Sequence, residues 1–177
     1  MPQPDPNALA RAENLIALIP DYPQPGVLFR DIAPLLADGP ALRAVIDALI
    51  APFEGEFDVV AGIEARGFLL AGAAAIAYDV GLVPIRKAGK LPRPAAAVDY
   101  ALEYGTATIE MHDDIPKGSR VLLLDDVLAT GGTLAAGREL VRQVGGEVAG
   151  IGALMELEAL GGRAVLGEEG LHTVFRA

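Results

Sequence analysis

No cysteine occurs among the 177 residues of the chain. This excludes a disulfide framework, a thiolate-bound zinc ion, an iron–sulfur cluster and a cysteine nucleophile. A chain without disulfides is well suited to a reducing compartment, so we expect a cytoplasmic protein.

Basic residues are also few, with 14 Lys and Arg against 24 Asp and Glu and a net charge of −10. This charge opposes nonspecific attraction to nucleic acid and to anionic membranes. We therefore expect small-molecule substrates as partners, with no nucleic acid and no membrane. A ligand that carries phosphate would have to meet a local positive site.

Long apolar runs are missing as well. The longest, residues 68–85, is interrupted by Asp79, Gly81 and Pro84 and falls short of the roughly 20 apolar residues that a membrane span needs. Residues 1–7 lack the cationic and apolar stretches of a secretory signal. Because 52% of the residues are hydrophobic and only 21% are charged, we expect one compact domain over residues 1–177.

Helical and strand-like patterns alternate along the chain. Apolar residues at helical spacing predict helices over residues 7–19, 40–53, 67–78 and 133–144. Short apolar runs predict strands over residues 58–63, 81–85, 121–124 and 148–154. This alternation predicts an α/β fold, an open and mostly parallel sheet flanked by helices, whose ligands bind beyond the carboxyl ends of the strands.

One segment has the composition of an exposed loop. Residues 87–94 combine two prolines and a glycine with three cations. Residues 98–104 and 106–111 lie on either side of Gly105 and could pair as an antiparallel arm. We predict a mobile loop over residues 87–104 that closes over a ligand.

The predicted strand over residues 121–124 leads into two adjacent carboxylates, Asp125 and Asp126. They lie too far before the next helix to cap it. Residues 129–133 (ATGGT) are small or hydroxylated and precede that helix, so their backbone N–H groups can bind an anion. The segment is neither a Walker loop nor a dinucleotide site, because it lacks Gly-Lys-Ser/Thr and the spaced glycines. Carboxylates ahead of a phosphate cradle suit a ribose 5-phosphate group.

Residues 121–133 (VLLLDDVLATGGT) resemble the phosphoribosyl diphosphate (PRPP) signature of the type I phosphoribosyltransferases. Four more segments resemble the adenine phosphoribosyltransferases of that family: residues 21–32 (DYPQPGVLFRDI), 62–68 (GIEARGF), 86–92 (RKAGKLP) and 102–105 (LEYG). The resemblance covers nearly the whole chain. It implies the type I phosphoribosyltransferase fold, with a small N-terminal hood over residues 1–34, a core over about residues 35–177 and a flexible antiparallel arm. It also implies a homodimer.

The resemblance implies transfer of ribose 5-phosphate from PRPP to adenine, which gives AMP and pyrophosphate in purine salvage. Mg²⁺ would be held mainly through PRPP oxygens, because it prefers oxygen ligands and keeps several waters. Asp125 and Asp126 would hold the ribose hydroxyls near the reacting carbon. The sugar phosphate would be bound by Ala129, Thr130, Gly131, Gly132 and Thr133.

The pyrophosphate would be bound by Ala65, Arg66, Lys87 and Lys90. Taken by itself, Arg66 could also be a surface residue in a turn. Ala65 stands where many relatives carry Ser, so one hydroxyl contact to this anion is in question while backbone contacts remain.

A purine nitrogen must lose its proton, so the reaction needs a base near it. Glu103 could be a charge on an exposed strand, but the resemblance implies that it is the general base, with Tyr104 in the closing loop. Adenine would contact Val27, Leu28, Phe29, Arg30 and Leu157, residues that would equally suit core packing. Related enzymes for 6-oxopurines place a Lys in the strand after the signature helix. Residues 147–177 contain no Lys, which favours adenine.

Two alternatives stay open. The first is a phosphoribosyltransferase for another purine, such as xanthine or guanine. The second is a catalytically silent regulator that senses PRPP, although a regulator of DNA would need a basic face and this chain is acidic. His112 and His172 lie far apart in the sequence without a partner motif, and we assign them no chemistry.

Overall fold

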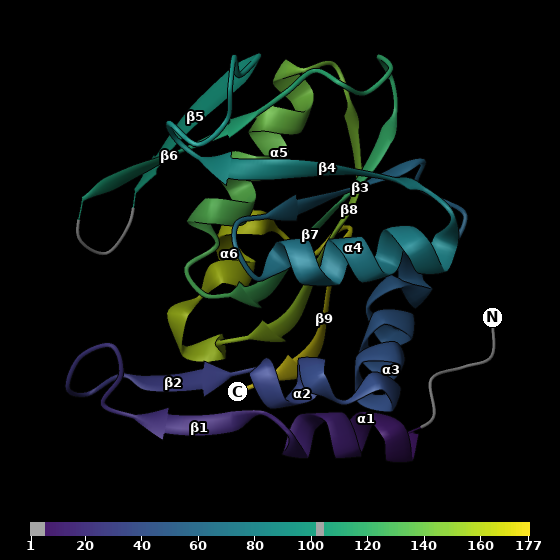
Figure 1. The fold of residues 1–177 in the computed structure, drawn as a ribbon. Coiled ribbons are helices and arrows are strands. Elements are labelled where there is room, and N and C mark those ends of the chain that lie inside the picture. Colours follow the sequence, from purple (N-terminus) through teal and green to yellow (C-terminus); the bar gives the residue numbers. More distant parts are fainter. Residues whose placement is uncertain (1–5, 102–104) are drawn as a thin grey trace. The chain divides into compact units, whose positions relative to one another are not determined.

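The computed structural model describes residues 6–101 and 105–177 (Figure 1). Their contacts group into two compact units, one ending at Ala51 and the other running from Pro52 to Ala177. The sequence places the end of the hood at residue 34. Helix α3 (Gly39–Ile50) nevertheless packs against α1 (Pro6–Asn14), so the first unit extends beyond that position.

The first unit contains a two-stranded antiparallel sheet besides its helices. β1 (Ala17–Pro20) pairs with β2 (Leu28–Asp31), and α2 (Ala33–Ala37) follows. The predicted helix over residues 7–19 is therefore wrong beyond Asn14, because Ala17–Pro20 form backbone pairs with β2 instead.

Asp38 joins two helices of this unit. Its carboxylate accepts the backbone N–H of Ala41 at 3.0 Å, which caps α3, and it also pairs with Arg11 of α1. Pro40 lies in the first turn of α3, where its missing N–H has no cost. The Asp38-Gly39-Pro40 sequence therefore starts the helix as predicted.

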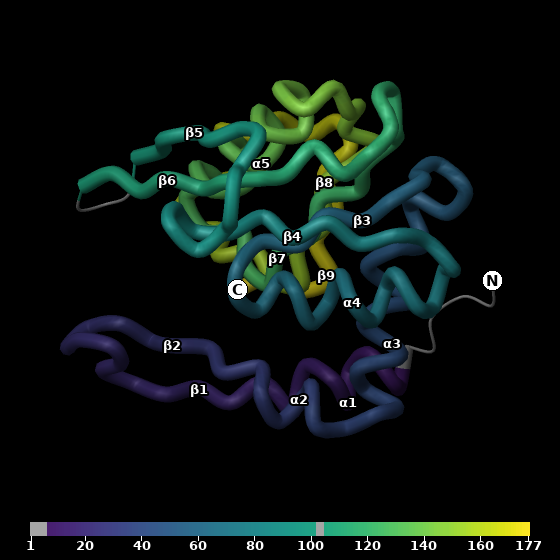
Figure 2. The backbone as a smooth tube through the Cα atoms, turned by 45° about the horizontal axis from the view of Figure 1, so that its top comes forward, coloured from purple at the N-terminus to yellow at the C-terminus, as the bar shows by residue number. Residues whose placement is uncertain are grey.

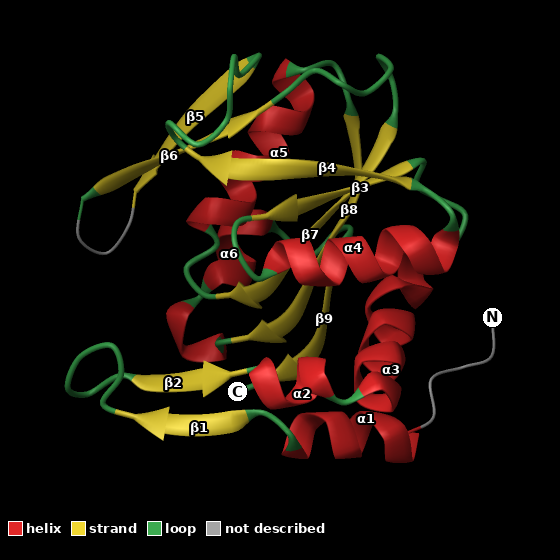
Figure 3. Ribbon diagram, in the orientation of Figure 1, coloured by secondary structure: helices red, strands yellow, loops and turns green. Residues whose placement is uncertain are grey.

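The second unit is built on a seven-stranded sheet in the order β5-β6-β4-β3-β7-β8-β9 (Figure 3). Its strands are β3 (Val59–Ile63), β4 (Gly81–Lys87), β5 (Ala96–Ala101), β6 (Thr106–Met111), β7 (Arg120–Leu128), β8 (Glu147–Glu156) and β9 (Leu171–Arg176). Five of them run parallel, while β5 and β6 form an antiparallel pair at one edge (Figure 2). The predicted α/β fold and its antiparallel arm are confirmed.

Two helices cover opposite faces of this sheet (Figure 1). α4 (Gly67–Tyr78) lies so close to β3 that a Cβ on Gly62 would come within 2.8 Å of the Cβ of Ala71. α5 (Gly132–Gln143) instead packs against Ile63, the next residue of β3. Adjacent strand residues point to opposite faces, so the two helices enclose the sheet between them. The chain enters this unit within η1 (Ala51–Phe53), and η2 (Glu158–Leu160) and α6 (Gly162–Leu166) are its other helical segments among the described residues.

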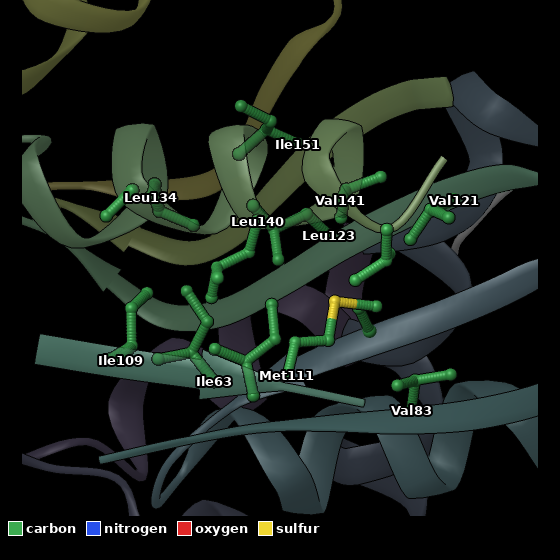
Figure 4. Packing of buried hydrophobic residues seen from close by; sticks show 14 of the residues in the cluster. Ile63, Val83, Ile109, Met111, Val121, Leu123, Leu134, Leu140, Val141 and Ile151 are labelled. Atoms are coloured by element: carbon green, nitrogen blue, oxygen red, sulfur yellow. The ribbon is translucent and has the colours of Figure 1, made fainter. Parts of the chain in front are cut away.

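The main core lies between α5 and the sheet. Side chains from β3, β6, β7 and α5 meet there, among them Ile63, Ile109, Leu123 and Leu140 (Figure 4). The apolar residues of β7 from Val121 to Leu124 are fully buried, as expected of a strand covered on both faces. The helices among the described residues have at most 12 residues, and none has the length and apolar character needed to cross a membrane.

Four connecting segments lie together at the carboxyl ends of the parallel strands (Figure 3). β3 leads into residues 64–67, β4 into residues 88–95, β7 into residues 129–131 and β8 into residues 157–161. The ligands of parallel sheets bind just beyond these carboxyl ends. Most residues that the sequence singles out lie there.

Candidate active site

The two carboxylates lie inside a strand. β7 continues to Leu128, so Asp125 and Asp126 belong to its buried part, whereas the sequence indicates that they follow the strand. Each residue is only 8% exposed. The Oδ1 atom of Asp125 accepts the backbone N–H of Asp126 at 2.8 Å. The sheet therefore holds both carboxylates in fixed positions.

Burial governs the charge of this pair. Loss of water raises the pKa of Asp125 well above its ordinary value, and the neighbouring Asp126 raises it further. Burial also raises the pKa of Asp126, although the nearby Arg66 guanidinium opposes that shift. Arg66 thus favours the ionised form of both carboxylates, and it contacts Asp126 directly.

Residues 129–133, which we call the ATGGT loop, connect β7 to α5. Gly131 is the N-cap of α5 with φ +83°, a conformation that glycine adopts without strain. It brings no side chain to cap the first N–H groups of the helix, which have no partner within the helix itself. These N–H groups are thus available to an anion.

A small pocket of about 100 Å³ lies at this loop. It is lined by Asp125, Val127, Leu128, Ala129, Thr130, Gly131, Thr133 and Leu134. One predicted sugar ligand and four of the five predicted phosphate ligands thus share one pocket, while Asp126 and Gly132 do not line it. The pocket combines a carboxylate with the positive end of a helix dipole.

The EARG loop, residues 64–67, lies directly against β7. A Cβ on Gly67 would come within 2.8 Å of the backbone oxygen of Leu124 and 3.1 Å of the Asp125 carboxylate, so only glycine fits there. The close approach allows the Nη2 atom of Arg66 to lie 2.6 Å from the Oδ2 atom of Asp126. The peptide bond between Glu64 and Ala65 is cis.

Glu64 connects the EARG loop to the segment after β4. Its carboxylate accepts the backbone N–H of Lys87 at 2.9 Å and the ammonium group of Lys90 at 2.6 Å. These contacts, with Lys90 the largest, lower the pKa of Glu64 below its ordinary value. The structure therefore brings the predicted cations Lys87 and Lys90 beside the loop that carries Arg66.

Glu64 was not singled out from the sequence. It lies within the GIEARGF segment, but a single Glu after a strand does not indicate what it contacts. The available signal was its place at the carboxyl end of a predicted strand, two residues before Arg66.

Other predicted residues are not brought into this arrangement. Glu103 and Tyr104 lie outside the described residues. Leu28, Phe29 and Arg30 lie in β2 of the first unit, with Val27 just before them, and the Phe29 ring meets the Tyr22 ring edge-on at 5.1 Å between centroids. Leu157 follows β8 in the second unit. The base contacts of these residues stay predictions.

Comparison with known proteins identifies the family. Residues 35–164 match the family model described as the phosphoribosyl transferase domain. The chain is 58% identical over 164 residues to an adenine phosphoribosyltransferase from Arthrobacter, and the match covers 92% of this chain and 89% of that protein. The chain belongs to the adenine phosphoribosyltransferase family.

Solved structures of adenine phosphoribosyltransferases agree with this assignment. The enzyme from Rhodothermus marinus is 48% identical with a TM-score of 0.91, covering 98% of this chain and 100% of that one. The enzyme from Saccharomyces cerevisiae, solved with D-2,5-dideoxy-2,5-imino-altritol 1,6-bisphosphate and adenine, is 36% identical with a TM-score of 0.88, covering 95% and 98%. The predicted fold and the predicted class, a pentosyltransferase of purine salvage, are confirmed.

Proposed function

We propose that the chain transfers ribose 5-phosphate from PRPP to adenine, giving AMP and pyrophosphate. The observation that carries the proposal is the pocket in which Asp125 lies beside the ATGGT loop. N–H groups at a helix N-terminus bind a phosphate, and a carboxylate accepts hydrogen bonds from sugar hydroxyls. The bisphosphate and adenine bound to the Saccharomyces cerevisiae relative support ligands of the same kind.

In the proposed reaction a ring nitrogen of adenine attacks the anomeric carbon of PRPP. The new C–N bond forms as the bond to the pyrophosphate oxygen breaks, and its electron pair leaves with pyrophosphate. Positive charge develops on the ribose ring and negative charge on the leaving group, so fixed charges and positioning supply most of the rate. Asp125 and Asp126 hold the ribose hydroxyls and lie close to the developing positive charge.

The leaving pyrophosphate is assigned to the EARG loop and the cations beside it. Ala65 contributes backbone contacts, and Arg66, Lys87 and Lys90 contribute positive charge. Lys90 contacts Glu64 and is half exposed, so its ammonium group can exchange this carboxylate for pyrophosphate. Arg66 is one-third exposed and can turn part of its guanidinium away from Asp126.

Mg²⁺ is assigned to the substrate rather than to a protein cage. Within residues 6–101 and 105–177 no group of three or more His, Asp or Glu side chains could hold a metal ion. The carboxylates of Asp125 and Asp126 are oxygen donors of the type that Mg²⁺ prefers, and they fit an ion that takes most of its ligands from PRPP and water. When bound, the ion would neutralise charge on the leaving pyrophosphate.

Glu103 is assigned as the base that accepts the proton from adenine, and Tyr104 to the segment that closes over the site. The predicted mobile loop over residues 87–104 would exclude water and protect PRPP from hydrolysis. The roles of Glu103 and Tyr104 rest on the LEYG resemblance. A carboxylate near the purine nitrogen is a suitable general base.

Adenine is the proposed base because β8 carries no Lys that could donate to a 6-oxo group. Val27, Leu28, Phe29, Arg30 and Leu157 are the proposed adenine contacts. A backbone carbonyl can accept from the amino group of adenine. A 6-oxopurine would leave that carbonyl unpaired at a cost of about 1–3 kcal/mol.

We also propose a cytosolic homodimer. Leu69 and Ile76, one face of α4, are 54% and 86% exposed, and Leu82 of β4 is 43% exposed. Apolar side chains exposed together are typical of a protein interface. A cytosolic site agrees with the absence of cysteine. Sedimentation of the wild type and of Ile76→Glu tests the dimer, and the variant is expected to sediment as a monomer.

The reaction is tested with PRPP, Mg²⁺ and one base at a time: adenine, hypoxanthine, guanine and xanthine. We expect AMP and pyrophosphate from adenine and no comparable turnover of the other bases. Turnover of guanine or xanthine but not adenine would overturn the base assignment. Binding of PRPP in calorimetry without turnover of any base would favour the silent regulator instead.

A further inference from the structure

Glu156 and Arg163 form an ion pair that the proposed reaction leaves without a role. Glu156 is the last residue of β8, and its side chain is only 6% exposed. Its two carboxylate oxygens accept from Nε of Arg163 at 2.9 and 3.0 Å, and one of them accepts from Nη2 at 2.6 Å. Such a two-pronged contact fixes both the position and the plane of the guanidinium.

A residue of β9 completes this cluster. The hydroxyl of Thr173 donates to Glu156 at 3.1 Å and accepts from Arg163 at the same distance. The contacts with Arg163 keep the pKa of Glu156 below its ordinary value, so the carboxylate stays ionised. The second partner of Arg163, Glu168, is 80% exposed, and a pair so exposed to solvent contributes little.

Arg163 belongs to α6, a helix of only five residues. A helix this short has few hydrogen bonds of its own and depends on outside contacts to stay in place. Two polar contacts tie it to other elements: the fork on Glu156 near its start, and the hydrogen bond from Arg138 of α5 to the backbone oxygen of Leu166 at its end, 3.0 Å long. The start of α6 is therefore held by the sheet, and its end is held by α5.

The start of α6 packs directly against the ATGGT loop. A Cβ on Gly131 would come within 2.7 Å of the backbone oxygen of Gly162 and 3.2 Å of Val165. From the other side, a Cβ on Gly162 would overlap the backbone oxygen of Ala129 and lie 2.9 Å from the N atom of Gly131. The two backbones leave no space between them, so a shift of α6 must move the loop.

We propose that Glu156 and Arg163 are positioning residues that hold α6 as a rigid support behind the ATGGT loop and so set its affinity for the phosphate of PRPP. The inference rests on the proposed function, because it assumes that this loop binds the phosphate. Neither side chain lines the pocket at the loop, so the pair acts through the contact of Gly162 with Ala129 and Gly131.

Arg163→Lys tests the proposal, since Lys keeps the charge but cannot form the fork. The matched control is Arg120→Lys. Arg120 forms a similar fork on Asp58 at 2.7 and 3.2 Å, but at the opposite end of β7. A second control, Glu168→Gln, removes only the exposed partner of Arg163.

The Michaelis constants for PRPP and for adenine are measured separately, together with kcat and the melting temperature. For Arg163→Lys we expect a KM for PRPP raised by about tenfold or more, because small displacements of binding groups have large effects, with the KM for adenine unchanged. Arg120→Lys is expected to lower the melting temperature while both KM values stay at the wild-type level. Glu168→Gln is expected to change none of these quantities.

Glu156→Gln is the second variant, used if Arg163→Lys does not fold. It removes the charged acceptor of the fork, leaving Arg163 with its exposed partner Glu168, and should raise the KM for PRPP in the same way. A loss of stability with unchanged KM for PRPP in the variants that fold would show a merely structural role and overturn the proposal. So would failure of both variants to fold. A wild-type protein that neither binds PRPP nor makes AMP would overturn the proposed function itself, which is a different result.

Discussion

The guanidinium of Arg66 lies 2.6 Å from the carboxylate of Asp126. The first residue belongs to the loop after β3 and the second to the buried part of β7, so this ion pair joins two neighbouring strand ends of the sheet. We assign one end to pyrophosphate and the other to the ribose. The pair thus places a cation at the boundary between the leaving group and the sugar, where charge separates during the reaction.

Replacement of Arg66 by Gln should therefore affect the contacts with both the pyrophosphate and the ribose of PRPP. We expect kcat/KM for PRPP to fall on the order of 100-fold, which is typical for loss of one group that stabilises a transition state. Steady-state kinetics with PRPP as the varied substrate gives this value. Arg142→Gln makes the same change of charge at the exposed end of α5 and should retain wild-type kinetics. Wild-type kinetics in Arg66→Gln would refute the assignment.

Asp125→Asn should lower the activity of the enzyme but raise its stability. A carboxyl group whose pKa is raised by folding binds its proton more tightly in the folded chain, so its ionisation at neutral pH costs stability. The Asn variant removes this cost and keeps an oxygen to accept the N–H of Asp126. We expect a higher melting temperature than wild type at pH 7, with use of PRPP reduced on the order of 100-fold or more.

The difference in melting temperature between Asp125→Asn and the wild type should depend on pH. As pH falls through the raised pKa of Asp125, the wild type takes up its proton and the advantage of the variant shrinks. The advantage of the variant disappears below pH 3.8, the ordinary pKa of the carboxyl group, because the group is then protonated in both folded and unfolded chains. Melting curves at several pH values measure this. A variant that is less stable at every pH would contradict the account.

Gly131→Ala should damage the ATGGT loop by two mechanisms. The backbone has φ +83°, which costs an Ala about 1–2 kcal/mol, and the added Cβ would meet the backbone oxygen of Gly162 at 2.7 Å. Gly118 also has positive φ, +79°, but has nothing within 4 Å of an added Cβ. Gly118→Ala is thus the control for strain alone.

Urea unfolding should show a larger loss of stability for Gly131→Ala than for Gly118→Ala. The difference is the cost of crowding, which is about 1–3 kcal/mol for added methyl groups in packed sites. Only Gly131→Ala should raise the KM for PRPP. Equal losses in the two variants, with equal KM values, would show that the contact with Gly162 does not constrain the loop.

Glu103→Gln should lower turnover strongly while PRPP still binds. The amide keeps the shape of the side chain but cannot accept the proton of adenine, and general base catalysis contributes about 10²–10⁴-fold. Single-turnover kinetics gives the chemical rate, and calorimetry gives the affinity for PRPP. Glu169→Gln, an exposed change of the same type, is the control. Normal turnover in Glu103→Gln would remove this residue as the base.

The sequence predicts the elements that carry a strong local signal. The helix over residues 67–78 has the predicted bounds, because an apolar, small-residue segment between two strands has few alternatives. The ATGGT loop was found for a similar reason: small and hydroxylated residues before a helix are a local pattern. Asp125 was found because a carboxylate at the end of an apolar strand is unusual.

Elements that depend on distant partners were missed. Ala17–Pro20 read as the end of a helix, but they pair with β2, whose residues begin at Leu28. β9 was not predicted, because its pairing with β8 is set by the sheet rather than by its own sequence. The cluster of Glu156, Arg163 and Thr173 joins three separate elements, and no spacing rule brings such residues together.

The central claim is that the ATGGT loop binds the phosphate while the adjacent carboxylates bind the sugar. A crystal structure with AMP tests it most directly. We predict that the 5′-phosphate accepts hydrogen bonds from backbone N–H groups between Ala129 and Thr133, with the ribose hydroxyls on Asp125 and Asp126. AMP bound elsewhere, with this loop free of phosphate, would contradict the account.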